Sequence, residues 1–118
     1  MKDESRLFEA GPDLFGRTWK VQFRWLQTGI SIRHADTVDV KFFLTPTNGV
    51  TEEKVVALPH PALLQLTGER GRKLSDAYCM RIAAAHLKHM VETTEDMDKT
   101  LVTLSPEELS TYDRQIER

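Results

Sequence analysis

The sequence predicts an α+β domain in which an antiparallel sheet packs one face against a long helix. Apolar and polar residues alternate along much of 18–58, and this pattern indicates strands because successive side chains of a strand point to opposite faces. A helical repeat of apolar residues over 76–92 indicates one long amphipathic helix. The chain has 118 residues, of which 40% are hydrophobic and 29% charged, as is typical of one globular domain.

The segment 1–16 mixes charges of both signs with a few apolar residues and is broken by glycine and proline. We expect a loose N-terminal arm with room for one helical turn, whose apolar side chains dock on the rest of the protein. A single α+β domain is expected to span 17–104, and a C-terminal helix is expected over 105–118.

Four strands are predicted between the arm and residue 58. The first strand begins at Thr18, and its core-facing residues are Trp19, Val21, Phe23 and Trp25. A connection at 27–29 leads to a second strand at 30–33, and these two strands are expected to pair as a hairpin. The third strand covers 38–45 and, after a Pro-Thr-Asn-Gly turn, the fourth covers 54–58. The expected sheet is therefore a four-stranded antiparallel meander.

Two helices are predicted after the sheet, which ends at Pro59. Pro61 suits the first position of a short helix over 63–66. Ser75 is a predicted N-cap for the long helix, which ends near Glu92. The apolar stripe of the long helix is expected to cover the aromatic face of the sheet.

The chain closes with a short apolar segment and a third helix. Residues 101–104 form either a fifth strand or an extended connector. Ser105 followed by Pro106, with Glu108 three residues after the cap, is a strong helix start. The last helix has a narrow apolar stripe that suits docking in cis or on a partner subunit, and its candidate interface residues are Leu109, Tyr112 and Ile116.

The sequence gives no sign of export or of a membrane span. Its first residues are charged and lack a continuous apolar stretch, so no secretory signal is expected. The longest apolar runs, 55–58 and 82–85, are far shorter than the roughly 20 residues that cross a bilayer. The single cysteine, Cys79, is expected to be a reduced thiol, and the expected location is the cytoplasm.

The predicted sheet has an outer face, opposite the aromatic core, that is rich in basic side chains. Its members are Lys20, Gln22, Arg24, Ser31, Arg33, Asp39, Lys41 and Phe43. Single-stranded nucleic acids bind to such faces, where Lys and Arg neutralise phosphates and aromatic rings stack on bases. One aromatic ring is a small stacking platform, however, and antiparallel sheets commonly show a polar face to water. Leu26, also expected on the outer face, would equally suit a dimer interface.

A second basic cluster precedes the long helix and consists of Arg70, Arg72 and Lys73. The N-terminus of a helix favours anions, so these side chains are candidate anion contacts. The cluster lacks the glycine spacing and the preceding strand of a phosphate-binding loop.

Four side chains on the long helix are of types that bind zinc, namely Cys79, His86, His89 and Glu92. Completing such a site would require His34 or His60, and nothing in the sequence brings either near. A buried thiol and a hydrogen-bonded histidine are the commoner roles for such residues. No metal and no cofactor are therefore expected.

An enzyme is the less favoured class, because the only thiol–base pairs are Cys79 with His86 or His60. Two helical turns separate Cys79 from His86 by about 10 Å along the axis, too far for a hydrogen bond. Small-molecule binding or catalysis in a cavity between sheet and helix remains an alternative. Its polar contact would be His86 or Tyr78, and its aromatic walls would be Trp19, Phe23, Trp25 and Phe42.

The favoured function is a non-enzymatic binding or interaction module that self-associates as a homodimer through the outer face or the last helix. Single-stranded nucleic-acid binding through the outer face is the alternative. The net charge of −2 hides an uneven distribution, because acidic residues outnumber basic ones after residue 91. The acidic end is therefore expected to pair with the basic body in cis or across a dimer.

Overall fold

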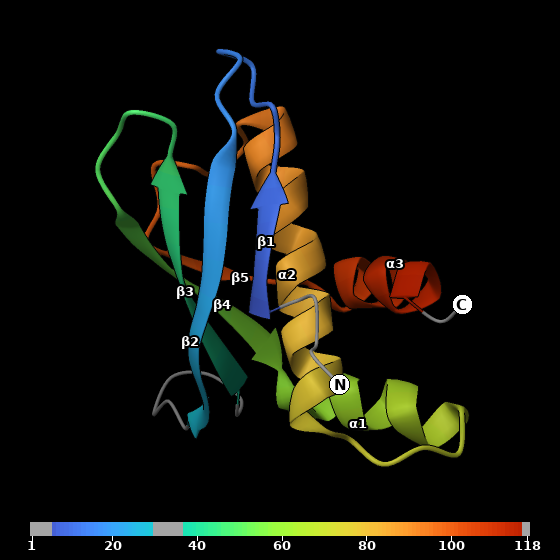
Figure 1. The fold of residues 1–118 in the computed structure, drawn as a ribbon. Helices are drawn as coiled ribbons and strands as arrows, with labels where there is room; N and C mark the ends of the chain where they lie inside the picture. The colour runs from blue at the N-terminus through green and yellow to red at the C-terminus, as the bar shows by residue number, and fades with distance from the viewer. Residues whose placement is uncertain (1–5, 30–36, 117–118) are drawn as a thin grey trace.

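A computed structural model describes residues 6–29 and 37–116, which form a five-stranded sheet and three helices (Figure 1). This architecture confirms the predicted α+β class, with an open sheet packed against a helix. The elements are, in order, β1 (Leu7–Ala10), β2 (Trp19–Gly29), β3 (Thr37–Pro46), β4 (Glu52–Pro59), α1 (His60–Glu69), α2 (Asp76–Thr93), β5 (Leu101–Thr103) and α3 (Pro106–Ile116).

The strands follow one another across the sheet in chain order, from β1 at one edge to β5 at the other. Neighbours from β1 to β4 are antiparallel, as a meander requires, whereas β5 is parallel to β4. The parallel pairing arises because α1 and α2 carry the chain back along the sheet before β5 begins. Residues 101–103 thus supply the fifth strand.

The segment around residues 7–10 is a strand, which corrects the expectation of a loose arm with one helical turn. Phe8 lies opposite Val21 of β2, and Ala10 lies opposite Trp19. Four residues are too few for alternation to show in the sequence. The turn that follows requires Gly11, whose φ is +117° and whose position would place a Cβ 2.9 Å from a backbone oxygen.

A β-bulge in β2 corrects the predicted alternation of that strand. The register with β3 shifts between Phe23 and Trp25, which leaves Arg24 as an extra residue. One extra residue moves every later side chain to the other face, so Trp25 lies opposite Lys41 on the outer side and Leu26 joins the core side. The sequence placed these two residues the other way round.

The strand β2 is also longer than expected. Residues 27–29, predicted as a turn, continue β2 and pair with 37–39 of β3. The hairpin partner of β2 is therefore the strand predicted over 38–45. The second strand predicted over 30–33 lies outside the described residues.

The helices begin where the capping residues predicted, except that α1 starts earlier, at His60. The Ser75 side chain accepts a hydrogen bond from the backbone N–H of Tyr78 at 3.1 Å, which fixes the start of α2. At α3, Ser105 Oγ accepts from the Glu108 N–H at 3.1 Å and Glu108 Oε1 accepts from the Ser105 N–H at 2.9 Å. Both bonds of the predicted capping box are present.

The helices pack on the inner face of the sheet (Figure 1). The helix α2 contacts β1 to β4, and α3 packs on α1 and α2. The core between sheet and helix is formed chiefly by Val21, Val40, Phe42, Leu44, Val56 and Leu58 from the strands and by Met80, Ala83, Leu87 and Met90 from α2. The buried apolar side chains of α2 thus pack against the inner face of the sheet.

The loop between β1 and β2 is organised by the buried carboxylate of Asp13. Its oxygens accept hydrogen bonds from the backbone N–H groups of Phe15 and Arg17, from Arg17 Nε and from the indole Nε1 of Trp19, at 2.8 to 3.0 Å. Burial alone would raise the pKa of Asp13, but these donors outweigh it and lower the pKa to about 2. Asp13 thereby holds Trp19 in the core and the loop closed over β2.

Replacing Asp13 with asparagine is expected to lower the free energy of unfolding at neutral pH. The ionised Asp13 carboxylate contributes to the free energy of unfolding at every pH above the ordinary carboxyl pKa of 3.8. This contribution is lost as the pH falls toward 2, because Asp13 binds a proton more readily in the unfolded state than in the folded state. D13N should therefore flatten the acid limb of a plot of unfolding free energy against pH, measured by urea titration. The exposed Asp98→Asn variant is the control, and an equal effect of both would contradict the assignment.

Candidate functional site

The outer face of the sheet lies opposite the helices, which leave it uncovered (Figure 1). The register places two adjacent rows of side chains across its centre. One row runs from β5 to β2 as Leu101, Val55, Lys41 and Trp25. The next row runs from β4 to β1 as Glu53, Phe43, Gln22 and Leu7. Together these eight residues define the outer-face patch.

The patch exposes apolar side chains that a solvated sheet face would not need. Leu7 is 54% exposed, Leu101 57% and Trp25 38%, whereas Phe43 and Val55 between them are half-buried. Scattered apolar residues are normal on protein surfaces, but a contiguous group marks an interaction site. The outer face thus has an apolar centre.

The bulge brings cations and aromatic rings together in this centre. The guanidinium of Arg24 lies 4.8 Å from the Phe43 ring centroid. The Lys41 ammonium lies 5.6 Å from the Trp25 ring and 5.7 Å from the Phe43 ring, and it also pairs with Glu53. These cation–π contacts hold the long side chains flat over the rings.

The outer face is balanced in charge, which sequence reasoning missed. Lys20, Arg24, Lys41 and Phe43 lie where they were predicted, and Arg33 with Ser31 lies outside the described residues. The strands β1 and β4 add acidic residues: Glu9 lies directly opposite Lys20, and Glu53 pairs with Lys41. Asp39 lies at the far end of the face. Lys20 and Lys41 thus each have an acid beside them, whereas Arg24 lies over the Phe43 ring.

The apolar stripe of the last helix is used within the chain. Leu109 and Tyr112 are buried and Ile116 is half-buried against the core, so the first two are not available to a partner subunit. Two polar contacts reinforce this packing. The Tyr112 hydroxyl lies 2.9 Å from His86 Nδ1, and the carboxylate of Asp113 accepts hydrogen bonds from Tyr78 of α2 and from Arg70, which follows α1.

Asp113 is 1% exposed and joins three elements. It accepts from the Tyr78 hydroxyl at 2.7 Å and from Arg70 Nε at 2.8 Å, with Arg70 Nη2 at 2.7 Å. Burial, and then the hydrogen bond to this carboxylate, raise the pKa of Tyr78 well above its ordinary range. Arg70, predicted as an anion contact, is therefore committed to Asp113. This ion pair is one cis contact between the acidic end and the basic body.

The predicted metal candidates do not form a cluster. Within residues 6–29 and 37–116, no group of three or more histidine, cysteine or acidic side chains is arranged to hold a metal. The Cys79 thiol is buried, and burial raises its pKa to about 12, so it is protonated. His86 is bound to Tyr112, while His89 and Glu92 are exposed.

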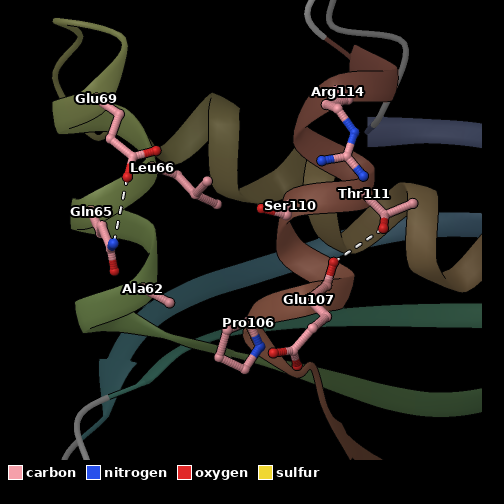
Figure 2. Close-up of a pocket in the computed structure, with 9 residues that line it drawn as sticks. All are labelled: Ala62, Gln65, Leu66, Glu69, Pro106, Glu107, Ser110, Thr111 and Arg114. Atoms are coloured by element: carbon pink, nitrogen blue, oxygen red, sulfur yellow. Dashed lines mark hydrogen bonds between the residues drawn. The ribbon is translucent and has the colours of Figure 1, made fainter.

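Surface hollows occur beside the helices. One of them, of about 450 Å³, lies between α1 and α3, with Leu66 and Pro106 among its apolar lining (Figure 2). Its hydrogen bonds stay within each helix, from Gln65 to Glu69 and from Thr111 to the Glu107 carbonyl. The groove therefore gathers no convergent set of donors or acceptors.

The expected cavity between sheet and helix is largely filled. Trp19 and Phe42 are buried in the core. Phe23 and Trp25 line only a marginal hollow of about 260 Å³ between β2 and α2, which neither His86 nor Tyr78 lines. Trp19 and Phe42 thus act as packing groups of the core.

Comparisons with known proteins add no assignment: no protein family, no curated protein and no solved structure matches the chain. Across the described residues, the helices are too short or too polar for any of them to span a membrane.

The buried His86 is expected to make stability depend on pH. Burial lowers the pKa of His86, and the neighbouring His89 adds to this, while the carboxylates of Glu108, Asp96 and Glu95 oppose it. His86 therefore binds a proton more readily in the unfolded state than in the folded state. As a result, the free energy of unfolding is highest above a pH of about 6.5 and falls as the pH drops below that value.

The measurement is the free energy of unfolding as a function of pH, from about 7.5 to about 5, a range that brackets the ordinary histidine pKa. His86→Gln should remove a slope of at most about 1.4 kcal/mol per pH unit. His89→Gln, on the exposed side of the same helix, should leave that slope in place. An unchanged slope in H86Q would contradict the prediction.

Proposed function

We propose that the protein is a self-associating binding module, in which the outer-face patch of one copy packs against the same patch of a second copy. The observation that carries this proposal is the uncovered apolar centre around Trp25 and Phe43, which Leu101 extends to the β5 edge of the sheet. Sheets commonly pack face to face by interdigitating such side chains.

The composition of the patch supports a protein partner. Aromatic and arginine side chains are enriched in the buried centres of protein interfaces, and the patch has Trp25 and Phe43 next to Arg24. Lys41 contributes its alkyl chain while its ammonium is neutralised by Glu53. Burying the patch would therefore leave few unpaired charges.

Its balance of charge supports a second copy in particular. A two-fold interface brings one surface against itself, so a face of a single charge sign would repel its own copy. The outer face carries Lys20 and Lys41 together with Glu9, Asp39 and Glu53, and is thus suited to its own copy.

The same balance disfavours the nucleic-acid alternative. A phosphate backbone needs cations that are free to replace counterions. On the outer face, Lys41 is already paired with Glu53, and Glu9 lies opposite Lys20. A polyanion would also meet the carboxylate of Asp39.

The test is sedimentation velocity of the full chain over a range of concentrations, with Trp25→Asp as the variant. The wild type should dimerise, and loss of one aromatic anchor of about 2 kcal/mol or more should weaken the dimer at least about 30-fold. Leu64→Asp is the matched control, because Leu64 is also exposed but lies on α1, away from the outer face. Circular dichroism checks that both variants fold.

A wild type that stays monomeric at every concentration would overturn the proposal, as would equal effects of W25D and L64D. Anisotropy of a fluorescent single-stranded oligonucleotide decides the alternative. Binding by a monomeric wild type that is lost in W25D would assign the outer face to nucleic acid instead.

A further inference from the structure

One cation and one acid of the outer face, Arg24 and Asp39, take no part in an ion pair within residues 6–29 and 37–116. The Arg24 guanidinium lies over the Phe43 ring, 4.8 Å from its centroid. One carboxylate oxygen of Asp39, Oδ1, accepts a hydrogen bond from the Thr37 hydroxyl at 2.8 Å. Both side chains therefore keep donors or acceptors that can receive a partner of opposite charge.

Arg24 and Asp39 lie on opposite sides of the row that crosses the outer-face patch from Trp25 through Lys41 to β5. Along β3, Asp39 comes two residues before Lys41, and Phe43, under the Arg24 guanidinium, comes two residues after it. The alternating burial of β3 places these three residues of the strand on the same face. Two residues of strand span about 7 Å, so the two charges lie at similar distances from the row.

We propose that the dimer is symmetric about a two-fold axis along this row, so that Arg24 of each copy forms an ion pair with Asp39 of the other copy. The inference rests on the proposed function, because it specifies how the outer-face patch meets a second copy. A two-fold axis in the plane of the interface turns one side of the row onto the other side. It therefore forms the same ion pair twice and packs Trp25 and Leu101, at the two ends of the row, against their own copies.

The cost of burying charge favours this arrangement over others. A charged group that loses water without gaining a partner is strongly destabilising. Lys41 also meets its own copy on the axis, but it carries the neutralising Glu53 with it. For Arg24 and Asp39, the second copy supplies the opposite charge. The guanidinium can remain stacked on the Phe43 ring while its edge donates to the carboxylate.

The test uses two charge-reversed variants of the full chain, Arg24→Asp and Asp39→Arg, alone and as an equimolar mixture. Each variant alone places like charges opposite each other twice per dimer, so sedimentation velocity should show a Kd about 100-fold or more above that of the wild type. The mixture should form heterodimers, because both contacts of a heterodimer then join an acid to an arginine. Native mass spectrometry identifies the heterodimer by its mass.

Lys88→Asp and Glu92→Arg are the matched controls, because both residues are exposed on α2, on the other side of the sheet. Each should dimerise as the wild type does, and circular dichroism checks that every variant folds. A further variant combines Arg24→Asp with Asp39→Asn, which keeps the size of the Asp39 side chain. It should dimerise more tightly than R24D alone, because one of the two like charges is removed at each contact.

A wild-type dimer whose Kd is unchanged in both R24D and D39R would overturn the ion pair and leave the proposed function standing. Absence of heterodimers in the mixture would also overturn it, because two residues that only lie in the same interface do not restore each other. A wild type that stays monomeric contradicts the proposed function itself, and the ion pair with it.

Discussion

The packing of α2 against the inner face of the sheet is the contact on which the rest of the architecture depends. Met80, Leu87 and Met90 of the helix share one buried core with Val40 and Phe42 of the strands. Each such side chain contributes roughly 1.5–3 kcal/mol when buried, so together they outweigh any single polar contact of the fold. With α2 fixed along the sheet, the chain returns to the β4 edge and adds β5 in parallel.

Polar contacts then determine how the C-terminal half sits on this core. The buried Lys54 amino group donates to the carbonyls of Met97 and Lys99 at 2.8 and 2.7 Å, which ties the segment before β5 to β4. Asp113 and Tyr112 fasten α3 to the helices beneath it. Buried polar groups of this kind are costly when left unpaired, so they favour one placement of α3 over others.

The candidate surface follows from what the helices cover and what they leave open. Because the helices lie on the inner side, the outer face keeps its apolar centre and its alternating charges, which suit a second protein surface.

The sequence alone determined the elements whose signals are local. Side chains at Ser75, Ser105 and Glu108 cap their own helices, and alternation within the third predicted strand needs no partner to be read. These signals were sufficient for the fold class and for the positions of Lys20, Arg24, Lys41 and Phe43 on one face.

Only the tertiary structure decided which strand pairs with which and where the surface charges meet. A bulge exists only relative to the neighbouring strand, so the position of Trp25 could not be read from β2 itself. The acids of β1 and β4, and the pairing of Arg70 with Asp113, likewise depend on contacts between distant segments. Such contacts form because the whole core fixes the register, which no local pattern encodes.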